Sequence, residues 1–131
     1  MYKKLLIRYL QGGLPFLPIT LTHTTRSAEV SALVDSGSTV NVLPYGIGIQ
    51  LGLIWENQNF PMPHLVGILQ DTPAFGVLLT GEIDPFEPVA LAFAWVKSNN
   101  VPVILGQVNF FSEFDVYFFG SRKIFDIMPK Q

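Results

Sequence analysis

The sequence predicts an all-β fold of about seven to nine short strands with one or two small helices. Hydrophobic residues make up 49% of the 131 residues and charged residues only 14%, so a packed core is expected rather than disorder. The 11 glycines and 10 prolines are spread evenly, as turns between many short strands require. We expect residues 1–131 to form one domain of ordinary size.

Strand-like segments follow one another along the chain, each apolar or alternating and most bounded by turn residues. The expected strands are residues 1–8, 16–22, 29–34, 64–69, 75–83, 89–96, 101–106, 114–119 and 123–128. The first is interpreted as a strand and not as a targeting peptide, because the apolar run before Arg8, Leu5-Leu6-Ile7, has only three residues. Gly12-Gly13 and Gly120-Ser121 mark turns, and the latter joins the last two strands in a hairpin.

Two segments favour short helices. Pro44 can begin a helix and Gly52 can end it, which leaves about two turns between them. Gly46 and Gly48 would weaken this helix. Residues 107–113 form the second candidate, directly after Gly106.

The most informative stretch is a polar turn, Asp35-Ser36-Gly37-Ser38-Thr39, that follows an apolar strand. Asp-Ser-Gly alone is a common turn and favours an aspartate that caps a surface loop. Here, however, the wholly apolar residues before Asp35 place its carboxylate at the end of a buried strand, where a charge is costly unless it is hydrogen-bonded or neutralised. A matching apolar strand ends at Gly106 and leads into the second helical candidate.

With these elements in this order, the chain resembles the retropepsin-like aspartic proteases over most of its length. Leu43-Pro44-Tyr45 and Leu51-Gly52-Leu53 also resemble bacterial members of that group. The resemblance implies a closed β-barrel of the acid-protease type with one lobe per chain. It implies these site residues: Asp35 as the catalytic carboxylate; Ser36, Gly37 and Ser38 as support of its loop; Gly67, Ile68, Leu69, Phe75 and Gly76 as flap and substrate groove; and Leu105 and Gly106 as the second loop.

The resemblance also implies a mechanism and a partner. Such proteases need two carboxylates that share one proton, one acting as base and the other as acid. Asp71, Asp84, Asp115 and Asp126 do not repeat the loop sequence. A homodimer would place Asp35 beside its own copy. The expected substrate is an extended peptide or protein segment with apolar residues, cleaved in the acidic range.

Roles for the neighbouring residues follow from the same resemblance. The Ser36 hydroxyl is expected to bond across the two-fold axis, Gly37 to allow close approach of the backbone, and the Ser38 hydroxyl to donate to Asp35. The chain departs from the family pattern at Pro73, near the tip of a hairpin that is often glycine-rich. It also has Gln107 where viral relatives often carry an arginine.

Composition argues against several other classes. The absence of cysteine excludes disulfides and thiolate chemistry and fits a cytoplasmic location. His23 and His64 lack a third partner at ligand spacing, so we expect no metal and no cofactor. The net charge is −2 without a basic run, and no apolar run approaches a membrane span, so neither nucleic acid nor membrane is an expected partner.

Other functions stay open at this point. The same dimer without turnover would be a peptide-binding or assembly module. A serine nucleophile at Ser36 or Ser38 paired with a histidine is conceivable, but its motif is absent. Release of the domain from a longer precursor is a further possibility. Replacing Asp35 by Asn separates an enzyme from a binding module.

Overall fold

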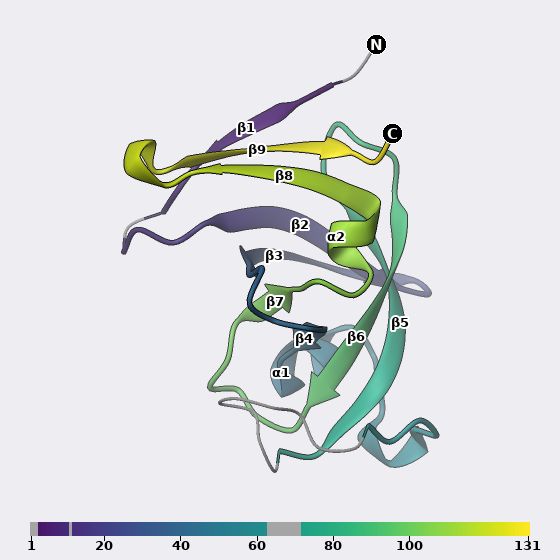
Figure 1. The fold of residues 1–131 in the computed structure, drawn as a ribbon. Helices are drawn as coiled ribbons and strands as arrows, with labels where there is room; N and C mark the ends of the chain where they lie inside the picture. The colour runs from purple at the N-terminus through teal and green to yellow at the C-terminus, as the bar shows by residue number, and fades with distance from the viewer. Residues whose placement is uncertain (1–2, 11, 63–71) are drawn as a thin grey trace.

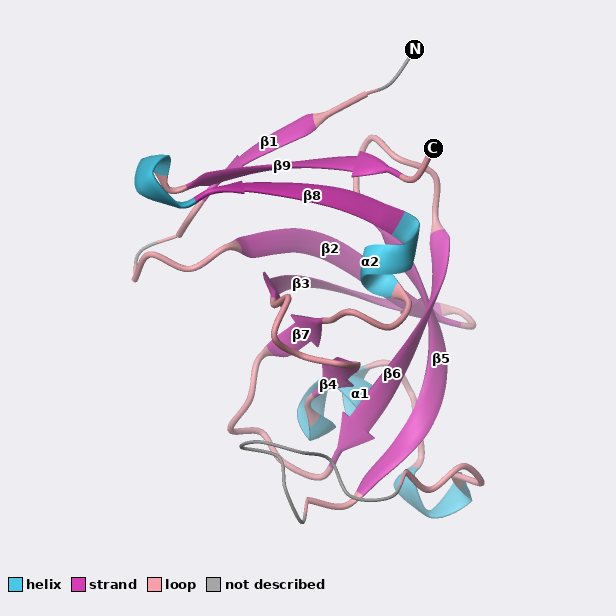
Figure 2. Cartoon of the chain, in the orientation of Figure 1, coloured by secondary structure: helices cyan, strands magenta, loops and turns pink. Residues whose placement is uncertain are grey.

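Six strands close into a barrel, and a separate three-stranded sheet packs beside it (Figure 1). The computed structural model describes residues 3–10, 12–62 and 72–131. The strands of these residues are β1 Leu5–Arg8, β2 Phe16–His23, β3 Arg26–Val34, β4 Asn41–Leu43, β5 Ala74–Glu82, β6 Val89–Val96, β7 Val103–Leu105, β8 Phe114–Phe119 and β9 Ile124–Pro129. The helices are α1 Tyr45–Gln50 and α2 Phe110–Glu113, with single 3-10 turns at Trp55–Asn57 and Gly120–Arg122 (Figure 2).

The barrel runs in the order β2-β3-β7-β4-β6-β5 and mixes two kinds of pairing. The hairpins β2–β3 and β5–β6 are antiparallel, whereas β3 pairs with β7 in parallel, with Val34 opposite Leu105. Because parallel strands end at the same edge, the loops that follow β3 and β7 leave the barrel side by side. These are the two loops that the sequence singles out.

The core fills the barrel with large apolar side chains. Trp95 and Phe93 from β6 and Leu17 and Leu21 from β2 are almost fully buried. Trp95 stacks on Tyr45 of α1 with ring centroids 5.7 Å apart, and its indole N–H donates to the Tyr45 carbonyl oxygen. A side chain at Gly48 would clash with the Trp95 ring. The glycine that weakens the helix by propensity is therefore needed for its packing.

The second sheet has the order β1-β9-β8, with β9 in the middle. Leu5 of β1 lies opposite Ile127 of β9, so strands from the two ends of the sequence pair with each other. Phe125 and Ile127 are fully buried, whereas Leu6 and Tyr117 are 59% and 51% exposed. The sheet thus covers part of the core with one face and exposes apolar side chains on the other.

The expected fold class is confirmed: a closed β-barrel with two short helices. Several boundaries differ from expectation. Pro44 is the N-cap of α1 rather than its first residue, and α2 covers only the last four residues of 107–113. The expected strand at 64–69 lies outside the described residues. In the described part of the chain, no helix is long and apolar enough to cross a membrane.

Candidate active site

Asp35 is the first residue after β3 and is half-buried. Along β3, the alternate residues Ala28, Ala32 and Val34 are buried in the barrel, as expected for a strand with one face toward the core. The Asp35 backbone N–H donates to the carbonyl oxygen of Leu105 at the end of β7, 2.9 Å away. This bond continues the parallel β3–β7 pairing and fixes the point at which the chain leaves the barrel.

The turn after β3 folds back on the Asp35 carboxylate. The Gly37 backbone N–H donates to Asp35 Oδ1 at 2.9 Å, and the Ser38 N–H donates to the Asp35 carbonyl oxygen at 3.1 Å. A Cβ atom at Gly37 would lie 3.2 Å from the same Oδ1 atom. Glycine at this position therefore lets a backbone donor approach the carboxylate closely.

The Ser38 hydroxyl does not donate to Asp35. It donates to the Val40 carbonyl oxygen, 2.8 Å away, so the expected Ser38–Asp35 hydrogen bond is wrong for this structure. The physical reason is local: a hydroxyl has one proton, and the Val40 carbonyl two residues ahead accepts it. Ser38 thus braces the loop, whereas the backbone of Gly37 contacts the carboxylate.

The loop after β7 clamps this turn from the other side. The Gln107 backbone N–H donates to the Ser38 carbonyl oxygen, and the Gln107 side-chain amide donates to the Ser36 carbonyl oxygen, each at 2.8 Å. Gly106 lies at the contact, where an added Cβ would be 2.5 Å from the Val40 oxygen and 2.7 Å from the Ser38 oxygen. Only glycine allows the two backbones to come this close.

A buried amide network holds the clamp to the barrel. Asn41 is fully buried; its Oδ1 accepts from the Gly106 N–H at 2.8 Å, and its Nδ2 donates to the Ala92 carbonyl oxygen at 3.0 Å. Asn109, which has a positive φ of 82°, accepts hydrogen bonds from Asn41 Nδ2 and from the Ala92 N–H at its side-chain oxygen. The second loop is therefore tied to β4 and β6 through side chains as well as to the Asp35 turn.

Comparison with solved structures finds the same architecture. A retropepsin-like aspartic protease from Rickettsia conorii superposes with a TM-score of 0.76 at 11% sequence identity, over 98% of this chain and 92% of that chain. The EIAV protease, solved in complex with the inhibitor HBY-793, superposes with a TM-score of 0.56 at 17% identity, over 76% of this chain and 88% of that chain. The chain has the retropepsin-like fold. Comparisons with protein-family models and with curated proteins found no match.

The retropepsin-like fold was predicted from the loop sequences, and the structure brings those loops together. Asp35, Ser36, Gly37 and Ser38 form one turn, and this turn contacts Leu105 and the residues beside Gly106. Asn41 and Asn109 were not predicted as supporting residues. The sequence contained one indication of the role of Asn41, which stands between Val40 and Val42 in an apolar stretch. An amide buried in such a stretch must find hydrogen-bond partners.

The expected flap is described only at its base. The Met62 N–H donates to the Ala74 carbonyl oxygen at 3.0 Å, and the Gly76 N–H donates to the Phe60 carbonyl oxygen at 2.8 Å. Phe75 lies on β5, with its ring centroid 4.6 Å from that of Trp55. Of the residues assigned to the flap, Gly67, Ile68 and Leu69 lie outside the described residues.

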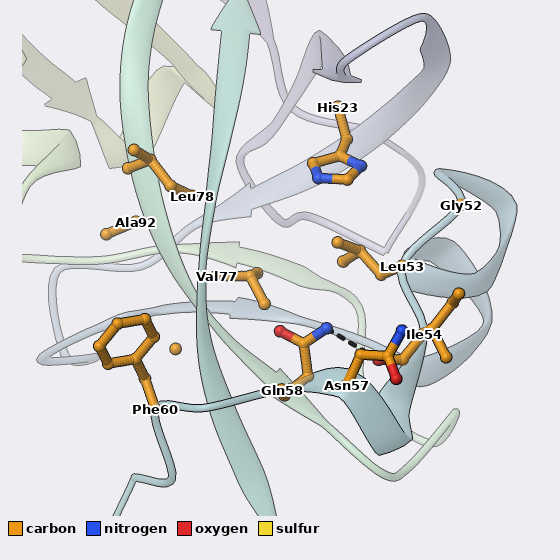
Figure 3. A pocket seen from close by; sticks show the side chains of 11 residues that line it. His23, Gly52, Leu53, Ile54, Asn57, Gln58, Phe60, Val77, Leu78 and Ala92 are labelled. Carbon is orange, nitrogen blue, oxygen red and sulfur yellow. Dashed lines mark hydrogen bonds between the residues drawn. The ribbon is translucent and has the colours of Figure 1, made fainter.

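Two hollows differ in position and chemistry. One of about 350 Å³ borders Asp35, with Leu14, Leu33 and Phe118 among its walls. A larger one of about 670 Å³ lies over β5, between His23, Ile54 and Phe60 (Figure 3). The described residues that line this larger hollow include no carboxylate, and His23 is the ionisable residue among them. In the described ranges, no three His, Cys, Asp or Glu residues are placed to hold a metal ion.

Proposed function

We propose that this chain is an aspartic endopeptidase that acts as a homodimer, with Asp35 of each copy forming the catalytic pair. The observation that carries the proposal is the placement of Asp35. Asp35 directly follows β3, on a turn that the loop after β7 holds through backbone-directed hydrogen bonds. These include the bonds from Asp35 to Leu105 and from Gln107 to Ser36 and Ser38. A catalytic group needs this kind of fixed position.

One chain supplies half of the required site. The other aspartates of the described residues, Asp84, Asp115 and Asp126, lie after β5, on β8 and on β9. A two-fold axis next to the Asp35 turn brings the second carboxylate within hydrogen-bond distance of the first. At such a distance both groups cannot be ionised at once, so the pair holds one proton.

This shared proton permits hydrolysis without a cofactor. The ionised carboxylate takes a proton from a water molecule, whose oxygen attacks the carbonyl carbon of the scissile peptide bond. The protonated carboxyl gives its proton to the carbonyl oxygen, and a tetrahedral diol forms. The carbon–nitrogen bond then breaks as the nitrogen receives a proton from the pair. A hydroxyl of the diol gives its proton to the pair in the same step, so the two carboxyl groups again hold one proton between them.

The proposed substrate is an extended peptide segment with apolar side chains. The flap base at Phe60 and Gly76 would cover it from one side, and strand-like backbone pairing would hold it. An apolar hollow of about 300 Å³ lies at the flap base, with Val40, Met62 and Val108 among its walls, and offers apolar contacts. These features support an extended, apolar class of substrate.

The test is cleavage of a denatured protein rich in apolar residues between about pH 3 and pH 8, which covers the acidic range expected for a carboxylate pair and neutral pH for comparison. The parent chain is compared with Asp35→Asn and with Asp115→Asn, a matched change at an exposed aspartate of β8. We expect cleavage in the acidic range by the parent and by Asp115→Asn, and none by Asp35→Asn.

The competing function is a dimeric peptide-binding module without turnover. Two results together would favour it. Neither the parent nor any variant cleaves, although the parent is folded and dimeric, and the parent and Asp35→Asn bind unfolded peptide with equal affinity. Cleavage that persists in Asp35→Asn would exclude Asp35 as the catalytic group and with it the proposal.

A further inference from the structure

The hollow of about 670 Å³ over β5 gathers apolar side chains that are open to solvent. Phe60, Leu78 and Ile54 line it and are 73%, 66% and 53% exposed. Leu53 and Val77 also line it and are buried. Single exposed apolar side chains are common on protein surfaces, whereas several around one hollow mark a binding site. The volume falls within the range of about 300–1,000 Å³ that small-molecule sites occupy.

The barrel is open along one short piece of β5 in this hollow. On its outer edge the Gly76 N–H donates to the Phe60 carbonyl oxygen at 2.8 Å. Thr80 pairs with Thr22 of β2 on the same edge. Because the backbone groups of alternate residues in a strand point to the same edge, the N–H and C=O of Leu78 point there too. Among the described residues, no hydrogen bond on that edge uses Leu78, so its N–H offers a donor to an occupant of the hollow.

The end of the hollow at the β2–β3 turn is polar and has a cationic side chain at its rim. His23 lines the hollow, and its Nδ1 atom lies 3.3 Å from the Leu51 carbonyl oxygen. A carbonyl oxygen only accepts, so Nδ1 carries a proton and Nε2 is left for another partner. Arg26 lies opposite His23 in the hairpin and packs on Gly52, where an added Cβ would be 3.9 Å from Arg26 Cζ. Gly52 itself lines the hollow, so the guanidinium lies beside the rim.

We propose that this hollow binds a small molecule that has an apolar body and one carboxylate. The carboxylate accepts a hydrogen bond from the Leu78 N–H and lies toward Arg26, and the apolar body lies against Ile54 and Phe60. The described lining contains no carboxylate that would repel this charge. A hydrogen bond to an ionised acceptor is about twice as strong as one between neutral groups, so a carboxylate suits the backbone donor better than a neutral head does. In Figure 3, His23 and Leu78 lie in the upper part of the view and Phe60 lies in the lower part, which separates the polar end from the apolar end.

This site is separate from the Asp35 turn and does not rest on the proposed function. The described residues that line it include none of those that line the hollow beside Asp35. The required chemistry occurs in free aliphatic acids and in the C-terminal ends of apolar peptides. The two sources differ in the amide groups of the body, and ligands of both kinds therefore belong in the test.

The test is isothermal titration calorimetry of the full chain with octanoate, below the concentration at which octanoate forms micelles. Octanamide has the same chain with a neutral head, and acetyl-trileucine has the same charge on a peptide. We expect a one-to-one complex with octanoate and a dissociation constant about three- to tenfold higher for octanamide. Tighter binding of acetyl-trileucine than of octanoate would assign the hollow to peptide ends, and the reverse would assign it to free aliphatic acids.

Two pairs of variants locate the complex. Ile54→Glu puts a like charge among the apolar walls, whereas Leu6→Glu makes the same kind of change on β1, at a side chain that is 59% exposed. Ile54→Glu should raise the dissociation constant of octanoate by about tenfold or more, and Leu6→Glu should leave it unchanged. Arg26→Gln should raise it by about two- to fivefold, as for an exposed charge pair, and Arg122→Gln should not. Arg122 is a matched control because its guanidinium also packs on a neighbour, 4.5 Å from the Phe119 ring centroid.

Amide spectra of the parent chain test the contact without any substitution. Octanoate should shift the N–H signal of Leu78, which gains a charged acceptor, and leave that of Gly120 in place. The inference is overturned if octanoate does not bind the parent, if it binds no better than octanamide, or if Ile54→Glu binds it as the parent does while circular dichroism shows both to be folded. Asp35→Asn should bind octanoate like the parent. Cleavage requires Asp35 and this binding does not, so failure of either proposal leaves the other standing.

Discussion

The side-chain amide of Gln107 donates to the carbonyl oxygen of Ser36, 2.8 Å away, and so joins the loop after β7 to the residue next to Asp35. The bond is exposed to solvent and is the only side-chain link between these two loops among the described residues. Because exposed hydrogen bonds add little to stability, we expect this bond to fix the position of the turn that carries Asp35 and to contribute little to the stability of the fold.

Removal of this bond tests that distinction. We expect Gln107→Ala to lower the free energy of unfolding by about 0.5–1.5 kcal/mol, the usual contribution of one hydrogen bond. We also expect kcat to fall by about two- to tenfold, because the turn that carries Asp35 is held less firmly. Gln58→Ala is the control, since Gln58 donates from its side chain to the Ile54 carbonyl oxygen, also at 2.8 Å. It should lose similar stability and keep its kcat. Equal loss of kcat in both variants would show that Gln107 has no special effect on the site.

The contact of Gly106 with the Asp35 loop predicts a large effect from one methyl group. In Gly106→Ala the new Cβ would meet the Val40 and Ser38 carbonyl oxygens at 2.5 and 2.7 Å, so one of the two loops must move. We expect the free energy of unfolding to fall by about 2 kcal/mol or more, as for other overpacked buried sites. Gly120→Ala, with nothing within 4 Å of the added Cβ, should stay within about 0.5 kcal/mol of the parent. Urea denaturation of both variants provides the measurement, and equal stability would contradict the tight contact.

The buried amide of Asn41 should be more important to stability than its size suggests. Asn41→Ala removes the partner of the Gly106 N–H and of the Ala92 carbonyl oxygen, and leaves a small cavity. Each buried group left without a partner costs about 1–3 kcal/mol, so a loss of several kcal/mol is expected. Asn59→Ala, at an exposed position, should be neutral. Thermal unfolding followed by circular dichroism would reveal the difference; a small loss for Asn41→Ala would mean that water replaces the amide.

The pH dependence of cleavage follows from two carboxyl groups that hold one proton. As the pH rises, the pair loses that proton and no acid remains to protonate the leaving group; as the pH falls, a second proton binds and no base remains. We therefore expect kcat/KM to follow a bell-shaped curve against pH, with its maximum on the acidic side. Measurement of kcat/KM between about pH 3 and pH 8 at constant ionic strength tests it, with circular dichroism at each pH to exclude unfolding. Activity that rises steadily toward pH 8 would exclude a proton-sharing pair.

The sequence predicts those strands whose own residues form an apolar or alternating run. β6 is apolar at all eight positions, from Val89 to Val96, and was expected with the same bounds that the structure shows. β4 has three residues and was not expected, because its existence depends on pairing with β6 and β7, which are far away in the sequence. Local composition contains no information on such partners.

In the site, too, features set by neighbouring residues were predicted, whereas features set by contacts in the folded chain were not. The position of Asp35 at the end of a buried strand follows from the apolar residues before it. The Ser38 hydroxyl was assigned to the wrong acceptor, because a choice between the Asp35 carboxylate and the Val40 carbonyl depends on geometry within 3 Å. The roles of Asn41 and Asn109 depend on contacts between residues 68 positions apart, which only the folded chain brings together.

The pairing of β1 with β9 sets an order of events during synthesis. Residues 5–8 find their hydrogen-bonding partners in residues 124–127, which emerge from the ribosome long after them. Until then the first strand has an unpaired edge, and the sheet that contributes Phe118 to the hollow beside Asp35 does not exist. A nascent chain that still lacks β9 would therefore hold a barrel without this side of the Asp35 hollow, and the proposed peptide cleavage would begin only after β9 has been made.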